Sequence, residues 1–282
     1  MSARNLKLAC VQADVAFGDP ELNAGKMLDK LEVLAADGVQ LAIWPEAYLT
    51  GYCVDSREDA ERIAIPLDHP VFAQIQAFCD RLAILAVVGF AEKAGGTLHN
   101  AAALIEPGEP IRTYRKSHLP VLGYDRFAEA GHSLEVFKTA IGRIGIIICY
   151  DQRPPEPARC LALDGADLIV LPTNWPDKAQ FAANLVAPVR AAENMVHYAA
   201  CDRVGNENGT QFIGLSGIYD PFGRMIAKAG DQEEVLIAEI DLNYGASKRI
   251  VNTPGEYEMA VMDERQPDIY EAIAKPYSSK PA

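Results

Sequence analysis

Short apolar segments of strand length alternate with helix-like segments along almost the whole chain. The segment LKLACVQ (6–12) leads into a helical pattern that ends at Gly38, and the strand-like LAIWPE (41–46) follows it. Strands that are buried on both faces read as near-continuous apolar runs, whereas amphipathic helices repeat every three to four residues. The alternation therefore predicts an α/β fold in which helices cover the sheets.

The same order continues toward the C-terminus. Further strands are expected at 82–93, 98–107, 111–119, 142–151 and 167–174, and further helices at 70–81, 155–166 and 179–196, the last interrupted by Pro188. Three later segments, YAACDRVG, FIGLSGIYDP and EVLIAEID, complete the series. No linker or change of composition divides the chain, so we expect 1–282 to form a single domain. Residues 245–282 lack strong periodicity and are expected to form a C-terminal arm.

Composition excludes several classes of function. The chain has 26 Lys+Arg against 39 Asp+Glu and a net charge of −13, which opposes binding to nucleic acid or to anionic membranes. No apolar run approaches the roughly 20 residues that span a bilayer. The five histidines lack the spacing of a metal site, and no glycine-rich nucleotide motif is present, so neither a metal nor a cofactor is expected. The six cysteines fall singly, which favours reduced thiols and a cytoplasmic location.

Three polar residues stand where predicted strands end: Glu46, Lys116 and Cys149. Ligand sites of α/β sheets gather beyond the carboxyl ends of strands, so these three side chains could converge. A carboxylate can deprotonate a thiol, and an ammonium can stabilise the resulting negative charge. Taken singly, each has an ordinary reading as a core thiol, a solvated strand end or a turn carboxylate.

The sequence around these positions resembles the nitrilase superfamily of carbon–nitrogen hydrolases. The likeness rests on three motifs in the family's order, and it covers nearly the full chain: PEAYLTGY around Glu46, YRKSHLP around Lys116 and GIIICYDQRPPEPAR around Cys149. It implies a four-layer αββα sandwich whose subunits pair through their outer helices, with the C-terminal segment reaching a neighbouring subunit. We therefore expect a homodimer or a larger homo-oligomer.

The resemblance also implies a role for each residue. Glu46 is the expected general base, Cys149 the nucleophile, and Lys116 the residue that stabilises the tetrahedral intermediate. The backbone N–H of Tyr150 is a plausible second oxyanion donor. Many members carry a further glutamate before the glycine that is Gly131 here, and direct alignment places Tyr124 at that position.

Two nearby carboxylates are candidates for the missing glutamate. A shift of one residue would nominate Asp125, and Glu129 is the alternative; the ordinary reading of either is a solvated loop charge. The chain also has Asp202 where the family often has asparagine, which weakens any role inferred for an asparagine there.

Other residues near the predicted strand ends could bind substrate. Asn174 could hydrogen-bond a substrate and Trp175 could form a pocket wall, although a turn asparagine before Pro176 is an equally good reading. The rings of Tyr52 and Tyr150 could line the site or simply pack in the core.

The function that this pattern favours is an amidase acting on a small aliphatic or ω-type amide and releasing a carboxylate and ammonia. The CYD context around Cys149 is more typical of the amidase branches than of nitrilases, whose segment usually begins CWE. An N-carbamoyl amine or amino-acid hydrolase would use the same three residues, and a nitrilase is the third alternative. A catalytically weak partner-binding scaffold is the fourth.

Overall fold

The computed structural model describes residues 4–276, which divide into two compact units, one ending at Ala246 and the other beginning at Ser247. The first unit contains two six-stranded sheets. In the first sheet the strands are ordered β14-β1-β2-β3-β4-β5. Their bounds are β1 Asn5–Gln12, β2 Leu41–Ile43, β3 Leu85–Ala94, β4 Thr97–Ile105, β5 Arg112–Arg115 and β14 Glu234–Asp241. Strands β1, β2 and β3 pair in parallel, while β4 and β14 run antiparallel to their neighbours.

The second sheet repeats this plan. Its order is β13-β12-β9-β8-β7-β6, with β7, β8 and β9 parallel at its centre. The bounds are β6 Val136–Thr139, β7 Gly142–Ile146, β8 Leu168–Thr173, β9 His197–Asp202, β12 Gly217–Tyr219 and β13 Met225–Lys228. A small separate hairpin joins β10 Asn206–Glu207 to β11 Thr210–Gln211.

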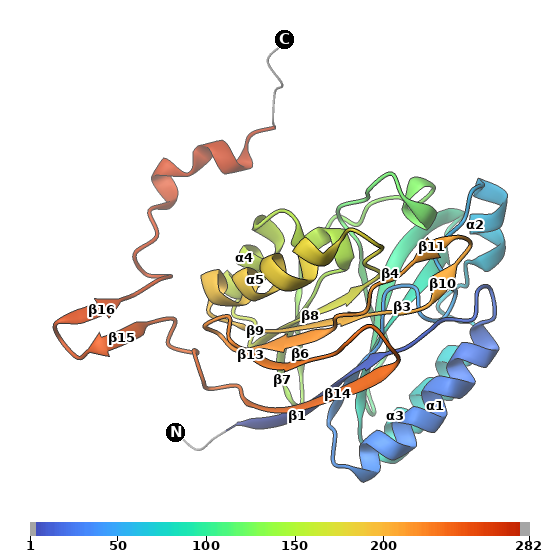
Figure 1. The fold of residues 1–282 in the computed structure, drawn as a ribbon, viewed down its shortest axis with the longest axis horizontal. Helices are drawn as coiled ribbons and strands as arrows, with labels where there is room; N and C mark the ends of the chain where they lie inside the picture. Colours follow the sequence, from blue (N-terminus) through green and yellow to red (C-terminus); the bar gives the residue numbers. More distant parts are fainter. Residues whose placement is uncertain (1–3, 277–282) are drawn as a thin grey trace. The chain divides into compact units, whose positions relative to one another are not determined.

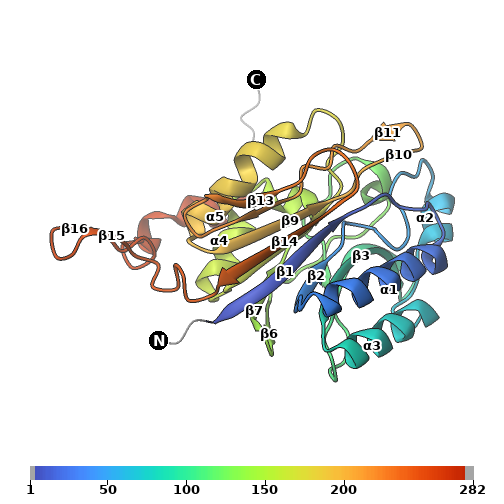
Figure 2. The ribbon, with the colours of Figure 1, turned by 60° about the horizontal axis from the view of Figure 1, so that its bottom comes forward.

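The two sheets pack face to face between two layers of helices (Figures 1 and 2). Helices α1 (Pro20–Ala36) and α3 (Pro70–Leu82) cover the outer face of the first sheet, and α4 (Glu156–Leu163) and α5 (Ala187–Asn194) cover the second. The short helix α2 (Arg57–Ile63) lies at one end of the first sheet. This confirms the four-layer αββα architecture expected from the sequence.

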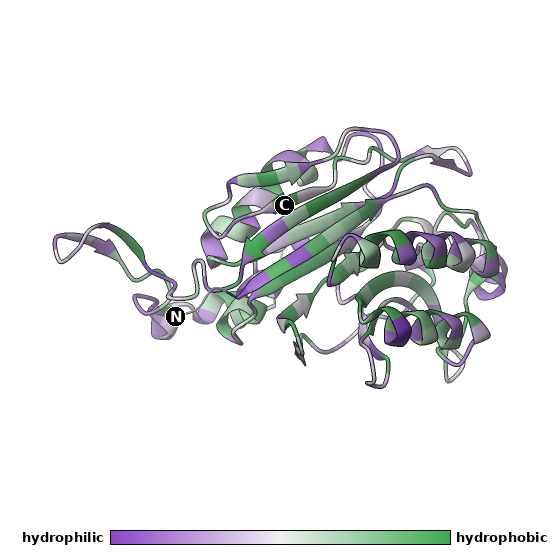
Figure 3. Ribbon diagram, turned by 90° about the horizontal axis from the view of Figure 1, so that it is seen from below, coloured by the Kyte–Doolittle hydropathy of each residue, from purple (hydrophilic) through white to green (hydrophobic). Residues whose placement is uncertain are grey.

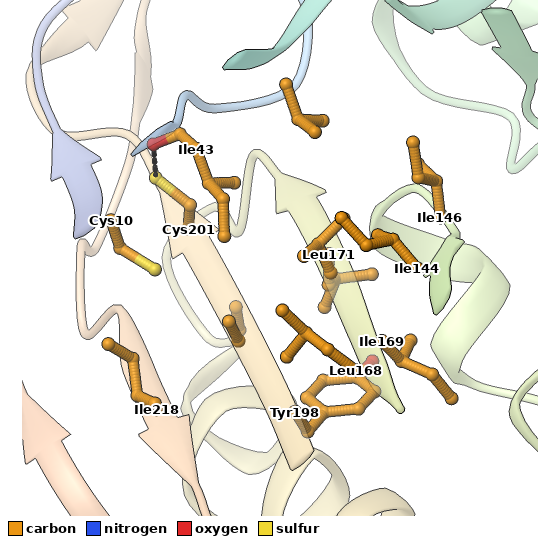
Figure 4. Close-up of a cluster of buried hydrophobic side chains, with 14 of the residues drawn as sticks. Cys10, Ile43, Ile144, Ile146, Leu168, Ile169, Leu171, Tyr198, Cys201 and Ile218 are labelled. Carbon is orange, nitrogen blue, oxygen red and sulfur yellow. Dashed lines mark hydrogen bonds between the residues drawn. The ribbon is translucent and has the colours of Figure 1, made fainter. Parts of the chain in front are cut away.

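Alternation along the strands divides the buried side chains between the layers. On β1, Leu8 and Cys10 face the core between the sheets, whereas Ala9 and Val11 pack with the residues of α1 and α3. Figure 4 shows the inter-sheet core, where the Cys201 thiol donates to the Ile43 carbonyl oxygen across the sheets at 3.1 Å. Both faces of β1 are therefore apolar, which is why its sequence is a nearly continuous run of apolar residues.

The outer helices are amphipathic. On α1, Met27, Leu31 and Leu34 are buried at helical spacing, and Asp19 caps the first turn by accepting from the Leu22 N–H at 3.0 Å. Figure 3 shows the resulting division into apolar and polar faces on the helices. Burial of one stripe fixes these helices against the sheet.

Several predicted elements differ from the structure near their ends. The strand expected at 111–119, for example, is only Arg112–Arg115. The helix expected at 179–196 contains a π-helical segment, Ala182–Val186, and continues directly as α5, with Pro188 two residues after that segment. The strand expected at 142–151 ends at Ile146, because the chain then turns sharply into a 3₁₀ turn, Cys149–Gln152.

The second unit contains a hairpin of β15 (Ile250–Thr253) and β16 (Tyr257–Met259), followed by 3₁₀ turns at Pro267–Ile269 and Glu271–Ala274. Its contact with another subunit stays a prediction. Within residues 4–276, no helix is both long and apolar enough to cross a membrane.

Candidate active site

Glu46 and Lys116 lie beyond the carboxyl ends of two strands of the first sheet. Glu46 follows β2, and Lys116 is the residue after β5. Strand β3 is parallel to β2, and two antiparallel pairings, β3 with β4 and β4 with β5, make β5 parallel to both. Both side chains are completely buried. The topology thus brings together two residues that are 70 positions apart in the sequence.

A glycine in β3 makes room for the segment that carries Glu46. The Gly89 N–H donates to the Pro45 carbonyl oxygen at 3.1 Å, and a Cβ atom at position 89 would lie 2.6 Å from the Glu46 Cα atom. Any side chain at this position would collide with backbone. Close approach of β3 therefore fixes where Glu46 stands.

Cys149 begins the 3₁₀ turn that follows β7, in the second sheet. Its φ of 46° lies in the left-handed region, which is uncommon for a residue other than glycine. Such conformations persist where the surroundings determine them, and they are concentrated at functional sites. The next N–H, that of Tyr150, is at the start of the turn, where N–H groups have no partner within the helix.

Asp151 connects the Cys149 segment to the Lys116 segment. Its buried carboxylate accepts from the Ile148 N–H at 3.0 Å, from the Tyr114 hydroxyl at 2.8 Å and from the His118 N–H at 2.8 Å. Tyr114 and His118 stand on either side of Lys116 in the sequence, and Ile148 directly precedes Cys149. The side-chain hydrogen bond to Asp151 also raises the pKa of His118.

A hydrogen-bonded network surrounds the Lys116 ammonium. Its Nζ donates to Glu46 Oε1 at 2.7 Å and to Asp125 Oδ2 at 2.6 Å. Asn100 Nδ2 donates to the same two carboxylates, at 2.7 Å each, and the Tyr52 hydroxyl donates to Asp125 at 2.8 Å. Glu46 Oε2 is buried and has no hydrogen-bond partner. One oxygen of Glu46 is held in place, and the other is free to take a proton.

Burial and neighbouring charges shift the pKa values of this network. Burial raises the pKa of the Glu46 carboxyl, with Lys116 opposing the shift and Asp125 adding to it. Burial opposes the charge on Lys116, but Asp125, Glu46 and the Cys149 sulfur together raise its pKa well above the ordinary value. Lys116 is therefore an ammonium, and Glu46 is a stronger base than an exposed carboxylate.

The thiol of Cys149 is protonated at neutral pH. Burial raises its pKa, and the nearby Glu46 charge raises it further, while Lys116 and the Asn174 backbone N–H act in the opposite direction. A thiol of this kind needs a base at the moment it attacks. Glu46 is the carboxylate whose charge acts directly on it.

A pocket of about 420 Å³ opens over Cys149. Its lining is mainly apolar and comes from four segments: Tyr52, Pro120, Leu122, Cys149, Tyr150, Gln152, Arg153, Asn174, Trp175, Pro176, Lys178, Ala179, Phe181, Ala182 and Val186. Mainly apolar pockets with a few polar groups are typical small-molecule sites. Glu46 and Lys116 are not among the lining residues, but the charges of both act on the Cys149 thiol.

Four of the predicted binding residues line this pocket: Asn174, Trp175, Tyr52 and Tyr150. The Asn174 side chain is 1% exposed, and neither its oxygen nor its nitrogen has a hydrogen-bond partner, so the amide is available to a ligand. The Trp175 N–H donates to Asp202 at 2.7 Å, which anchors the segment after β8. Asp202 thus holds this segment through its carboxylate.

The structure separates the two candidate carboxylates. Asp125 is buried and bonds Lys116, Asn100 and Tyr52, so its oxygens are taken by protein donors rather than turned to the pocket. Glu129 is exposed, and its backbone joins Leu98 and His99. Neither lines the pocket, and only Asp125 belongs to the network around Lys116.

Asn100 was not predicted from the sequence. It lies in β4, opposite Lys116, whose N–H donates to the Asn100 carbonyl oxygen at 2.8 Å. The signal for it is a lone amide inside the apolar run LHNAAALI, because a polar residue buried in a strand needs partners. Within residues 4–276, no group of His, Cys, Asp and Glu side chains could hold a metal ion.

Comparison with known proteins places this geometry in a family. The family model described as carbon–nitrogen hydrolase matches residues 7–250. A nitrilase of Pyrococcus abyssi is 36% identical over 87% of this chain and 93% of its own length. An N-carbamoylputrescine amidase of Solanum tuberosum is 32% identical over 82% of each chain.

A solved structure matches over the full fold. The carbon–nitrogen hydrolase of Helicobacter pylori G27 has a TM-score of 0.83 at 24% identity, covering 97% of this chain and 99% of that one. At this identity the likeness concerns the fold, including the two sheets and their helices.

Proposed function

Because the chain belongs to the carbon–nitrogen hydrolase family, we propose that it is an amidase that uses Cys149, Glu46 and Lys116. The amidase hydrolyses a small amide to a carboxylate and ammonia through a thioester on Cys149. One observation carries this proposal: a buried carboxylate with an unpartnered oxygen is hydrogen-bonded to an ammonium, and both charges act on a thiol that lines a pocket open to a small molecule.

In the first half of the reaction, Glu46 takes the proton from Cys149 and the sulfur attacks the amide carbon. Negative charge develops on the carbonyl oxygen, where the Lys116 ammonium and the Tyr150 N–H stabilise it. The carbon–nitrogen bond then breaks, and the proton held on Glu46 goes to the leaving nitrogen, which departs as ammonia.

In the second half, a water molecule enters the place of the ammonia. Glu46 takes one of its protons while the water oxygen attacks the thioester carbon. The carbon–sulfur bond breaks, the sulfur regains its proton, and the acid leaves. Asp125 and Asn100 are positioning residues here, because they hold Lys116 and Glu46 without reaching the pocket.

The substrate class proposed is a small aliphatic or ω-type primary amide. A mainly apolar pocket of about 420 Å³ suits a short chain, and the unpartnered Asn174 amide can bind a polar group on it. An N-carbamoyl compound is the second candidate, supported by the likeness to N-carbamoylputrescine amidase. It would release carbon dioxide as well as ammonia.

The test is a panel of short amides, ω-amides, N-carbamoyl compounds and nitriles, given to wild type and to Cys149→Ala. Ammonia release without carbon dioxide, lost in the variant, is expected from an amide. Equal amounts of carbon dioxide would indicate the carbamoyl reaction, and turnover of nitriles alone a nitrilase. Activity that survives in Cys149→Ala would contradict Cys149 as the nucleophile. No activity on any compound would contradict the proposed substrate class and favour a partner-binding scaffold.

We also propose that the protein works in the cytoplasm as a homodimer or larger assembly. All six cysteines are free thiols, which suits a reducing compartment. The outer layer of the second sheet exposes apolar side chains: Leu163, Leu185 and Val189 are 46%, 56% and 49% exposed. Exposed apolar side chains on outer helical segments suit subunit pairing.

A further inference from the structure

The pocket over Cys149 carries positive charge on a negatively charged protein. Arg153 and Lys178 both line it. Among residues 4–276, no aspartate or glutamate belongs to its lining. The chain as a whole carries −13. Both side chains are exposed to solvent, and a local reversal of sign at a pocket attracts a ligand of opposite charge.

Arg153 is held by contacts that leave its guanidinium without a carboxylate partner among residues 4–276. Its carbonyl oxygen accepts from Arg190 Nη2 at 2.9 Å, and its guanidinium lies 4.9 Å from the centre of the Phe181 ring. Stacking on an aromatic face leaves the N–H groups at the guanidinium edge free to bind a carboxylate. In the described part of the chain, no carboxylate forms an ion pair with Arg153.

Lys178 reaches the same pocket from the segment after Trp175. Its neighbour Asp177 accepts from the Lys178 backbone N–H at 2.9 Å and does not line the pocket. Over residues 4–276, the Lys178 ammonium has no ion pair with a carboxylate. Other cations of this region are already paired: Arg190, for example, binds Glu193 at 2.8 Å.

We propose that Arg153 and Lys178 form an anion subsite, and that the substrate is a short linear molecule with an amide or carbamoyl group at one end and a carboxylate at the other. The inference rests on the proposed function and narrows its substrate class. It excludes substrates whose far end is an amine, because two cations would repel that end. The apolar lining residues of the pocket contact the methylene chain of this substrate.

The experiment compares amides that differ only at the far end. 5-Amino-5-oxopentanoate ends in a carboxylate, 5-methylhexanamide in a neutral isopropyl group of similar shape, and 4-aminobutanamide in an ammonium. We expect kcat/KM to be at least about tenfold higher for the carboxylate than for the neutral amide, and lowest for the ammonium. N-Carbamoyl-β-alanine has the same chain length and the same carboxylate. Carbon dioxide release from it would show that the group cleaved is a carbamoyl group rather than an amide.

Variants test whether the two cations cause this preference. In Arg153→Gln and Lys178→Gln, the ratio of kcat/KM between the carboxylate and neutral amides should fall about three- to tenfold each, and salt should lower the ratio in wild type. Lys93→Gln, which removes an exposed charge outside the pocket, should keep the ratio. Equal rates on the three amides, or a ratio unchanged in both variants, would overturn the subsite.

A binding measurement keeps this test separate from the proposed chemistry. In Cys149→Ala, 5-amino-5-oxopentanoate should raise Tm more than 5-methylhexanamide does, and Arg153→Gln in that background should remove the difference. If no amide is hydrolysed but this difference is present, the proposed function fails and the subsite stands. If neutral amides are hydrolysed and no difference is seen, the subsite fails and the function stands.

Discussion

At the scale of single residues, the two oxygens of Glu46 have different surroundings. Oε1 accepts from both Lys116 and Asn100, while Oε2 is buried without a partner. A buried acceptor left unpaired costs stability, so its persistence suits a group that receives a proton during turnover. This difference is what separates Glu46 from Asp125, whose oxygens are both occupied.

Glu46→Gln tests the proposed base. An amide keeps the shape and the contact with Lys116 but cannot take a proton, so ammonia release should fall about 10²- to 10⁴-fold. The measurement is the initial rate on the best amide of the panel, with circular dichroism to confirm folding. Glu129→Gln removes an exposed carboxylate as a control and should act like wild type. A Glu46→Gln rate within a few-fold of wild type would show that another group is the base.

The pH profile is a second prediction at this scale. Glu46 acts as a carboxylate, and burial, helped by Asp125, raises its pKa above the ordinary value of 4.5. Activity should therefore be lost as pH falls, with the midpoint of the acid limb of kcat/KM above 4.5. Because Glu46 titrates together with its hydrogen-bonded partner Lys116, the midpoint belongs to the pair. A midpoint at or below 4.5 in a stable protein would contradict this assignment.

At the scale of elements, the site depends on strand β3, which contributes no functional side chain. Gly89 lets the backbone of 45–47 lie against this strand, and its carbonyl oxygen accepts from the Leu49 N–H at 3.1 Å. The order β2-β3-β4-β5 places β3 between the strands of Glu46 and Lys116. The separation of the base from the ammonium is therefore set by the packing against β3.

Gly89→Ala should displace Glu46. The added Cβ would lie 2.4 Å from the Ala47 nitrogen, so the backbone must move, at a cost of about 1–3 kcal/mol in stability and at least about tenfold in activity. Urea unfolding and ammonia release measure the two effects. Gly25→Ala is the control. Gly25 lies in α1, a Cβ atom added there would have no other atom within 4 Å, and the substitution should be neutral or stabilising. Normal activity in Gly89→Ala would show that the segment tolerates the shift.

Strand ends were predictable from sequence, but the contacts between them were not. Apolar runs located Glu46 and Cys149, and Lys116 was located at the end of a short polar strand, β5. Asn100 was missed because its partners come from positions 46 and 125, and no local pattern records them. Residue spacing likewise left Asp125 and Glu129 as alternatives, since only the three-dimensional path of the 3₁₀ turn Gly123–Arg126 decides which carboxylate is buried.

At the scale of the molecule, the four layers were predictable because every strand run and helix face had to be buried against another layer. The π-helical segment was not, since its side chains fit an ordinary helix and the extra residue per turn arises from packing. Ala182 and Val186 of that segment line the pocket. Phe181 directly precedes this segment, and the Arg153 guanidinium packs against its ring. The π-helical segment therefore helps to position the proposed anion subsite.

The outer layer also bears on assembly. Leu185 and Val189 are about half exposed, and apolar side chains gathered on one helical segment favour a self-complementary contact. We expect the wild-type protein to have about twice the mass of one chain by light scattering after gel filtration. The double variant Leu185→Lys, Val189→Lys should have the mass of one chain, because an isologous interface places each new charge near its own copy. Val33→Lys adds a charge at an equally exposed apolar residue of α1, in the opposite outer layer, and should leave the mass unchanged. A double variant that keeps the wild-type mass would place the interface elsewhere, and a wild type with the mass of one chain would contradict the homodimer itself.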